Sequence, residues 1–328
     1  MPLPEKTDNP AAGIIFILVG MAAISFNDML IKFLSGDYPL HQMVFTRSAI
    51  GIAFSLIIVQ FEGGWKILRT STPGLHILRG MMIVLANMTF FTALAVLTLA
   101  ETTAIFFVSP LLITLLSIPV LGEKVGPYRI GAVIIGLVGV VIVTRPWAAG
   151  SDNTAPFYVY LLPILAALTY AINQVLTRKL GATSRASAMA VYLQGMFILV
   201  SFGFWLAAGD GRYAQNLDNP SLVFLLRAWI WPTGTDLYLF GALGLNSAII
   251  GYTLAQAYRL SSAATVAPFE YIGLPLAIFW GWSVFGDLPD MVATSGITLI
   301  LASGLFVFLR ERRLNRPVIS AKRANRRI

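Results

Sequence analysis

Four charged side chains of this chain lie within long apolar stretches: Asp28, Lys32, Arg47 and Glu270. A charge at the centre of a bilayer costs roughly 3 kcal/mol, so such a residue needs a polar interior or a partner. A buried carboxylate can bind a cation or take up a proton. The chemistry that these residues predict is binding of a solute and coupling to an ion.

Glu270 is the strongest of the four candidates. It lies in the stretch Pro-Phe-Glu-Tyr at 268–271, and Pro275 follows. A proline inside a membrane helix frees backbone carbonyls and loosens the helix, which is useful where a cavity is lined. We expect Glu270 to be the central coupling or binding acid. The alternative is a packing role, with the carboxyl group hydrogen-bonded to a neighbouring helix.

The other three charges are predicted to form one network. Asp28 and Lys32 are one helical turn apart, so they can pair on one helix face. Arg47 lies at a similar depth in the next apolar segment and can reach Asp28 in competition with Lys32. The prediction is an outer gate built from these three charges. The alternative is a self-neutralised structural pair, with Lys32 reaching outward to water.

Uncharged polar residues within the apolar segments are weaker candidates for the wall of the same cavity. Their amide and hydroxyl groups can hydrogen-bond a solute, and tyrosine rings can stack on a planar one. Hydrogen bonding between helices is the alternative for each of them. The candidates are Asn87, Gln194, Tyr252, Gln256 and Tyr271.

The sequence has no motif typical of an enzyme. A histidine-rich metal site, a phosphate-binding glycine loop and a Gly-x-Ser-x-Gly elbow are all absent from it. The chain also has no cysteine, which excludes thiolate metal sites and cysteine nucleophiles. We expect no cofactor. Without an ATP-binding motif, the expected energy source is an ion gradient or the gradient of the solute itself.

Ten apolar segments must position these residues. Hydrophobic residues make up 57% of the chain and charged residues only 12%, which is too little charge for a soluble surface. About 20 apolar residues cross a bilayer as a helix. The prediction is an all-α integral membrane protein with ten transmembrane helices, at residues 11–34, 41–60, 77–96, 102–121, 129–143, 158–177, 188–207, 237–258, 263–285 and 292–309.

Two apolar segments differ from the others. Residues 129–143 are short for a span and carry Gly131, Gly136 and Gly139, a pattern typical of close helix packing. Residues 221–231 are too short to span and have Arg227 in their middle. They are predicted to form an amphipathic helix at the outer interface.

The ten segments form two halves of five that resemble each other. The first segment ends Asn-Asp-Met-Leu-Ile-Lys-Phe-Leu at residue 34, and the sixth ends Asn-Gln-Val-Leu-Thr-Arg-Lys-Leu at residue 180. Because five is an odd number, the second half crosses the bilayer in the opposite sense, as in carriers with two gates around one site. The predicted divisions are a cytoplasmic N-terminus at 1–10, five-helix repeats at 11–146 and 155–310, and a basic tail at 311–328.

The distribution of basic residues predicts that both termini are cytoplasmic. With the N-terminus inside, 18 of the 23 Lys and Arg residues fall on the inner side, Arg79 among them. Only Arg145, Arg212 and Arg227 fall on the outer side. The net charge of +8 does not indicate a nucleic-acid partner, because these residues lie in short loops and in the tail. The tail is expected to rest on anionic lipid headgroups.

Several motifs together resemble the drug/metabolite transporter superfamily, specifically the EamA-type proteins made of two tandem five-helix domains. In the first half they are Ala-Glu-Thr-Thr-Ala at 100–104, Ser109-Pro110, and Leu-Gly-Glu-Lys at 121–124. In the second half they are residues 268–271, then Phe-Gly-Asp-Leu-Pro at 285–289, then Gly296 and Gly304. The family usually has Glu where this chain has Asp287. The end of the first segment and the Pro-Phe-Glu-Tyr stretch are similar to a bacterial branch with riboflavin and S-adenosylmethionine carriers.

This resemblance implies ten helices, cytoplasmic termini and a central cavity, but neither the substrate nor the direction of transport. The expected function is a carrier of a small organic metabolite in the bacterial inner membrane, with riboflavin as the first candidate and protons as the candidate coupling ion. An S-adenosylmethionine carrier and an exporter of amino acids or drugs are alternatives within the same class. A channel and a polytopic membrane enzyme are alternatives from other classes. The oligomeric state stays open.

Overall fold

The computed structural model describes residues 10–121, 127–145, 147, 155–180, 184–215, 217–260 and 267–314, and within them every regular element is a helix. The first half of the chain contains α1 (Pro10–Leu34), α2 (Leu40–Glu62), the 3-10 helix η1 (Trp65–Leu68), α3 (Pro73–Leu94), α4 (Leu99–Phe106), α5 (Ser109–Leu121) and α6 (Pro127–Thr144). The second half contains α7 (Phe157–Leu180), α8 (Ala186–Ala208), α9 (Pro220–Leu226), α10 (Thr235–Leu260), the 3-10 helix η3 (Ala267–Ile272), α12 (Gly273–Phe285) and α13 (Met291–Leu314).

The helices are those of a multi-pass membrane protein. Seven stretches are long and apolar enough to cross a membrane, and three shorter apolar helices cover residues 130–144, 269–285 and 291–306. Large apolar side chains such as Leu199, Leu206 and Ile134 are mostly exposed on the outside of the bundle, as lipid contact requires. The predicted ten-helix, all-α membrane fold is confirmed.

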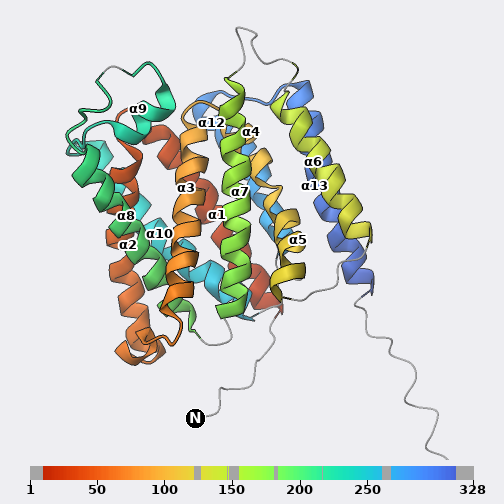
Figure 1. The fold of residues 1–328 in the computed structure, drawn as a ribbon, viewed down its shortest axis with the longest axis horizontal. Helices are drawn as coiled ribbons and strands as arrows, with labels where there is room; N and C mark the ends of the chain where they lie inside the picture. The colour runs from red at the N-terminus through yellow and green to blue at the C-terminus, as the bar shows by residue number, and fades with distance from the viewer. Residues whose placement is uncertain are drawn as a thin grey trace, which may run out of the picture.

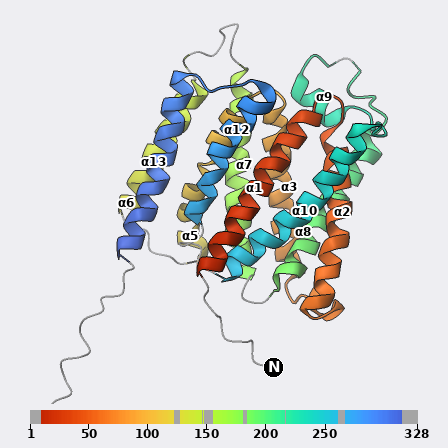
Figure 2. The same ribbon diagram turned by 180° about the vertical axis from the view of Figure 1, so that it is seen from behind.

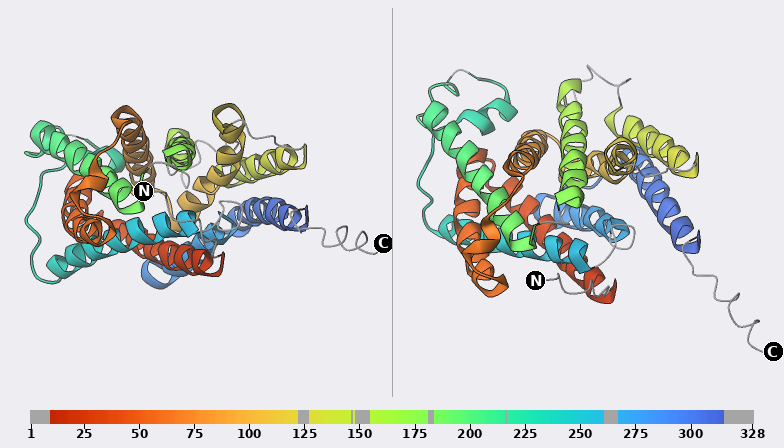
Figure 3. Two further views of the ribbon diagram at one scale, coloured as in Figure 1. Left: turned by 90° about the horizontal axis from the view of Figure 1, so that it is seen from below. Right: turned by 60° about the horizontal axis from the view of Figure 1, so that its bottom comes forward.

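The packing of the helices has the same pattern in both halves. Helix α1 packs against α10, and in the same way α7, the first helix of the second half, packs against α3. Helix α2 packs against its counterpart α8, and α6 against its counterpart α13. Figures 1 and 2 show α6 with α13 at one edge of the bundle and α2 with α8 at the other. From below, α3 and α7 lie on one side, and α1, α10 and α12 on the other (Figure 3).

Two of the predicted spans are interrupted rather than continuous. The span predicted at 102–121 consists of α4 and α5, which are separated at Phe107 and Val108. The described part of the span predicted at 263–285 begins as the 3-10 helix η3 and continues as α12. Proline explains both interruptions, because it has no N–H to donate to the residue four positions earlier. Pro110 stands at the start of α5, and Pro275 leaves the carbonyl of Tyr271 without its helical partner.

The two interruptions lie against each other near the middle of the bundle. The ring centroids of Phe107 and Tyr271 are 5.5 Å apart, and α4 packs on α12. In the sequence, Phe107 stands fifteen positions before Gly122 of the Gly-Glu motif, and Tyr271 stands fifteen positions before Gly286 of the Gly-Asp motif. The two rings are therefore equivalent positions of the two halves. Their contact packs the two breaks against each other.

Helices α6 and α13 pack closely through glycine. A methyl group added at Gly139 would lie 2.9 Å from the carbonyl oxygen of Gly296, and one at Gly136 would meet the side chain of Leu111. Among the residues that the structure describes, nothing lies within 4 Å of a methyl group added at Gly131. The predicted close packing is therefore confirmed for Gly136 and Gly139 and is wrong for Gly131.

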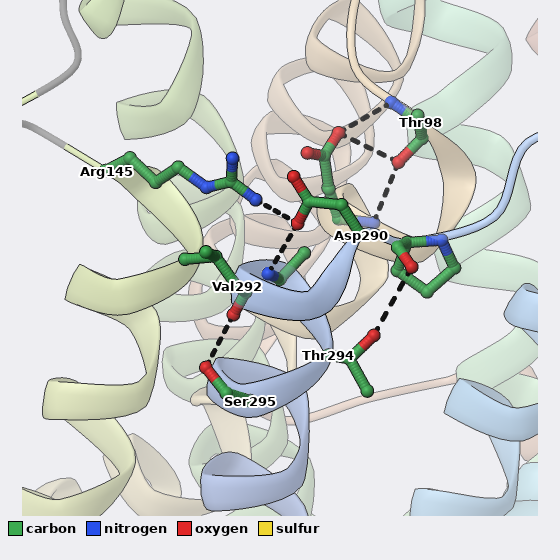
Figure 4. A network of polar contacts seen from close by, with 9 residues as sticks. Thr98, Arg145, Asp290, Val292, Thr294 and Ser295 are labelled. Atoms are coloured by element: carbon green, nitrogen blue, oxygen red, sulfur yellow. Dashed lines mark hydrogen bonds and ion pairs between the residues drawn. The ribbon is translucent and has the colours of Figure 1, made fainter.

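An ion pair joins the same two helices at the end of the bundle that carries α9, referred to below as the α9 end. The Arg145 guanidinium, just after α6, donates to the carboxylate of Asp290, just before α13 (Figure 4). Together with a hydrogen bond from the backbone N–H of Ala293, it lowers the pKa of Asp290 below its usual range. This ion pair links the end of α6 to the start of α13 at the α9 end of the bundle.

The short helix α9 differs from its prediction. It covers only Pro220–Leu226, with the Asn219 side chain accepting hydrogen bonds from the backbone N–H groups of Ser221 and Leu222. The helix ends before Arg227, whose extended backbone (ψ 158°) cannot continue it. The Arg227 guanidinium donates instead to the carbonyl oxygen of Gly36. The expected helix with Arg227 in its middle is therefore wrong.

Candidate functional site

Helices α1, α2 and α3 bring three of the predicted site residues to one depth. Asp28 lies six residues before the end of α1, Arg47 seven residues after the start of α2, and Asn87 seven residues before the end of α3. At a rise of 1.5 Å per residue, all three are about 10 Å from the α9 end. The long apolar helices therefore place these polar groups in one layer inside the span.

Arg47 is the centre of this layer. Its side chain is buried, and its two terminal nitrogens donate to the amide oxygens of Asn27 at 3.0 Å and Asn87 at 2.8 Å. The guanidinium also lies over the rings of Phe91 and Phe197, at 5.8 and 5.3 Å from the centroids. Amide oxygens and ring faces thus replace water around a buried cation.

Asp28 joins the network through Asn27. The Asn27 amide donates to Asp28 Oδ1 at 3.1 Å and, with its oxygen, accepts from Arg47. Among the described residues, Asp28 forms an ion pair with neither Arg47 nor Lys32 within 4.0 Å. The expected direct pairing of Asp28 is therefore wrong. Asn27 was not among the residues predicted from the sequence, yet it connects two that were, Asp28 and Arg47.

Lys32 lies apart from this network. Its Nζ donates to the carbonyl oxygen of Leu94, the last residue of α3, at 3.4 Å and to that of Leu97, in the turn that follows, at 2.7 Å. It also lies 5.4 Å from the centroid of the Phe285 ring. The last carbonyls of a helix have no partner within it, and a cation satisfies them well. Lys32 therefore completes the end of α3 instead of neutralising Asp28, and the predicted three-charge network is reduced to two charges.

Glu270 lies within η3 and is buried, with 4% of its surface exposed. The predicted loosening of the helix around it is confirmed, because this stretch is a 3-10 helix. The carboxylate is close enough to the hydroxyl of Tyr170, on α7, to act on it electrostatically. Gln174 Nε2 donates to the same hydroxyl at 2.5 Å. Glu270 thus lies within electrostatic range of a polar pair on α7, formed by Tyr170 and Gln174.

The remaining candidates are distributed over several contacts. Gln194 is buried where α8 meets α2, and a methyl group added at Gly51 would lie 2.6 Å from its amide. Its Oε1 atom is buried without a hydrogen-bond partner. On α10, Gln256 Nε2 donates to the hydroxyl of Tyr252 at 3.0 Å. Tyr252 is half-buried, with its ring edge-on to Phe16 at 6.2 Å.

Tyr271 is placed differently from the expectation of a ring that stacks on a solute. Its side chain is 6% exposed and belongs to the apolar core, against Phe107 and the backbone of Gly304. The absence of a side chain at Gly304 makes room for the ring. In this structure Tyr271 joins η3 to α4 and α13, so its contacts are those of packing.

A second buried arginine lies toward the opposite end of the bundle. Arg79, expected on the inner side with the loop residues, is in the second turn of α3 and is 6% exposed. Its Nε donates to Thr177 Oγ1 at 2.7 Å and its NH1 to the carbonyl oxygen of Met189 at 3.4 Å. It therefore holds α3 of the first half to α7 and α8 of the second. In the sequence, the only indication of this buried role was the position of Arg79 within an apolar segment.

The described residues contain no group of three His, Asp or Glu side chains that could hold a metal ion. The polar groups instead offer hydrogen-bond donors, acceptors and isolated charges on several helices. Such an arrangement can recognise a polar solute inside a membrane protein.

Comparison with known proteins gives a consistent class. Residues 11–145 match the EamA-like transporter family. The chain is 29% identical to the riboflavin transporter of Rhizobium johnstonii, over 96% of each protein. It is 24% identical to the S-adenosylmethionine uptake transporter of Rickettsia prowazekii, over 92% of this chain and 94% of the relative. It is also 25% identical to a pseudopaline exporter of Pseudomonas aeruginosa, over 89% and 94%.

The fold has a counterpart among solved structures. A protein of known crystal structure aligns with a TM-score of 0.64, covering 92% of this chain and 99% of the other at 21% identity. At this identity the likeness concerns the fold alone.

Proposed function

We propose, from the premise that residues 11–145 form an EamA-family domain of the drug/metabolite transporter superfamily, that the whole chain is a secondary transporter of a small organic metabolite. It works by alternating access between two inverted five-helix repeats, at 11–146 and 155–310, in the bacterial inner membrane. Transport without chemical conversion separates this proposal from a membrane enzyme. Saturable flux with counterflow would separate it from a channel.

The observation that carries the proposal is the exchange of helix contacts between the halves. The α1–α10 contact has its counterpart in α7–α3, while α2–α8 and α6–α13 each join equivalent helices. Two halves related in this way can rock against each other and expose one site to either side in turn. The buried polar groups around Arg47 and Glu270 lie on helices of both halves, as such a site requires.

Riboflavin is the first candidate solute. The amide of Gln256 and the phenol of Tyr252 lie inside the bundle and are hydrogen-bonded to each other. Gln256 is buried and Tyr252 is half-buried. Groups of this kind bind the carbonyl and imide edge of a flat heteroaromatic ring. The similarity to riboflavin transporters over nearly the whole chain supports the same candidate.

S-adenosylmethionine is the second candidate, and one feature of the site favours it. Asp28 is a half-buried carboxylate with no cationic partner within 4.0 Å among the described residues, so it can receive a cationic group. Export of amino acids or drugs is a third possibility within the same class. In each case Glu270 is the proposed coupling acid, and protons are the proposed coupling ion.

Thermal unfolding of the purified protein in detergent tests the proposal. The panel contains riboflavin, S-adenosylmethionine, nucleosides, amino acids and cationic drugs, since a ligand of the folded state raises the melting temperature. We expect one class to raise the melting temperature in a dose-dependent way. At a solute concentration of a hundred times the dissociation constant, the folded state should gain about 2.7 kcal/mol. Stabilisation by riboflavin, with growth of a riboflavin auxotroph on low external vitamin, would establish the first candidate.

Glu270→Gln tests the coupling role separately. We expect it to abolish concentrative uptake while the protein still inserts and unfolds at a similar temperature, because an amide cannot take up and release a proton. Asp210→Asn, the same change at an exposed loop carboxylate, is the matched control and should transport normally. Normal concentrative uptake by the Glu270→Gln protein would refute the coupling role and leave the carrier proposal standing.

A further inference from the structure

We propose that Asn27 is a positioning residue that keeps Arg47 from pairing directly with Asp28. The carboxylate oxygen left open on Asp28 then receives a hydrogen-bond donor of the solute, either an N–H or an ammonium group. The second part of this proposal rests on the transport function proposed above. The first part concerns the folded protein alone.

The geometry of the Asn27 amide is the first evidence. One end of this single amide donates to Asp28 Oδ1 at 3.1 Å, and the other accepts from Arg47 NH1 at 3.0 Å. The side chain is 3% exposed, so water does not compete for either bond. An amide can donate and accept at the same time, whereas a carboxylate only accepts and a guanidinium only donates. Asn27 therefore separates two opposite charges that would otherwise attract each other strongly.

Arg47 is held on the far side of this amide by neutral groups. Asn87 binds NH2 at 2.8 Å, and the rings of Phe91 and Phe197 lie near the guanidinium. Its Nε atom is buried and has no hydrogen-bond partner in the described part of the chain. A buried cation with neutral partners is less well stabilised than one in an ion pair with good geometry. Without the bridge, we expect the guanidinium to move to the carboxylate of Asp28.

The Asp28 carboxylate has one oxygen, Oδ2, that Arg47 does not contact. Among the described residues its hydrogen-bond partner is Asn27, which uses Oδ1. The Oδ2 atom has no partner there, yet it is absent from the fully buried atoms that lack one, so part of its surface is accessible. Lys32, one turn further on, is bound to the carbonyl oxygens of Leu94 and Leu97 at the end of α3 and in the turn after it. A half-buried carboxylate oxygen without a partner is a strong acceptor for a donor group.

Two candidate solutes share the required donor chemistry. The flat ring of riboflavin carries one imide N–H, and S-adenosylmethionine carries an ammonium group. Each can donate to a single carboxylate oxygen. A solute whose polar groups are all anionic or acceptor-only would be repelled there, so the open oxygen predicts selection by donor groups.

The second half of the chain provides a matched control. Asn173 is the repeat equivalent of Asn27, at the same place in the motif that ends α7, and Gln174 takes the place of Asp28. Asn173 is also buried, but its Oδ1 atom has no hydrogen-bond partner among the residues that the structure describes. The same substitution at the two asparagines therefore removes a bridge between charges in only one case.

Carbodiimide labelling followed by peptide mass spectrometry tests the positioning role without any solute. Carbodiimides attach to accessible carboxyl groups in apolar surroundings that can take up a proton, which an ion pair with arginine prevents, and Asp28→Asn defines the background. We expect labelling of Asp28 in the native protein, about tenfold slower labelling in Asn27→Leu, and native labelling in Asn173→Leu. Asn27→Ser, whose side chain is too short to bridge, repeats the test if the leucine variant does not fold. Equal labelling of Asp28 in the native and bridge-free proteins would overturn the positioning role.

Protection from the same reagent tests the donor. We expect riboflavin or S-adenosylmethionine, whichever stabilises the protein, to slow labelling of Asp28 at saturation. For riboflavin, methylation of the imide nitrogen should weaken binding about tenfold, since a hydrogen bond to a charged group is lost. A stabilising solute that leaves the labelling of Asp28 unchanged would overturn the donor assignment. If no solute of the panel stabilises the protein, the candidate solutes and the donor assignment fail, and labelling of the Asn27 variants still decides the positioning role.

Discussion

Two cations inside the membrane, Lys32 and Arg47, are accommodated in different ways. Lys32 takes two backbone carbonyl oxygens, that of Leu94 at the end of α3 and that of Leu97 in the turn after it. Arg47 takes two amide oxygens and two ring faces, and it remains near Asp28 without touching it. The first arrangement satisfies backbone carbonyl groups, and the second leaves Arg47 and Asp28 without a direct ion pair. The type of charge and its depth in the span do not predict which arrangement a residue adopts.

At the residue scale we predict that Lys32→Met lowers the stability of the protein by about 1–2 kcal/mol, because the last carbonyls of α3 lose a charged donor. The measurement is the melting temperature in detergent. Lys66→Met, at an exposed lysine of η1, is the control and should leave the melting temperature unchanged. Lys32→Arg should recover part of the loss. An unchanged melting temperature in Lys32→Met would show that this contact does not stabilise α3.

Glycine decides how closely the last helices of the two halves approach each other. Gly139 on α6 and Gly296 on α13 bring the two backbones into contact, so that no Cβ fits at either position without movement. The sequence indicated this role from the repeated glycines of residues 129–143. It did not distinguish Gly139 from Gly131, because the rotation of a helix relative to its neighbour is set by the partner helix.

At the element scale we predict opposite effects of one substitution at these two glycines. Gly139→Ala should destabilise the protein by roughly 1–3 kcal/mol, because its methyl group would overlap the backbone of α13. Gly131→Ala should be neutral or stabilising by up to about 1 kcal/mol, since alanine favours the helix and none of the described residues would meet its methyl group. Melting temperatures of the two proteins give the comparison. Equal effects would mean that α6 and α13 do not meet as described.

The two ends of the molecule differ in their composition. The α9 end carries the Arg145–Asp290 pair and the short helix α9, while the opposite end carries η1 with its exposed lysine. The basic residues of the whole chain are concentrated toward the opposite end and in the tail. The bias of basic residues to the cytoplasmic side is what sets orientation in membrane proteins.

At the scale of the whole molecule we predict that the α9 end faces away from the cytoplasm. Because the chain has no cysteine, single cysteines can report this directly. Thr233→Cys, exposed at the α9 end, should react with an impermeant maleimide in intact cells. Ser71→Cys, exposed between η1 and α3, should react only after the cells are permeabilised. The reverse pattern would overturn the orientation and, with it, the cytoplasmic termini.

The sequence alone determined the class and the spans of this protein. Within a bilayer each backbone group must find its partner inside its own helix, so local composition is enough to locate a span. Proline likewise marked the irregular stretch at Glu270, because the loss of an N–H is a local effect.

The tertiary structure decided which side chains meet. Asp28 and Lys32 have the right spacing to pair, but each found a different partner, Asn27 for one and the end of α3 for the other. Arg47 reached Asn87 across forty residues of chain. Such contacts depend on how each helix is rotated and tilted against its neighbours, and that is set by packing over the whole bundle. The open carboxylate of Asp28 is therefore a property of the fold, although every residue that creates it is visible in the sequence.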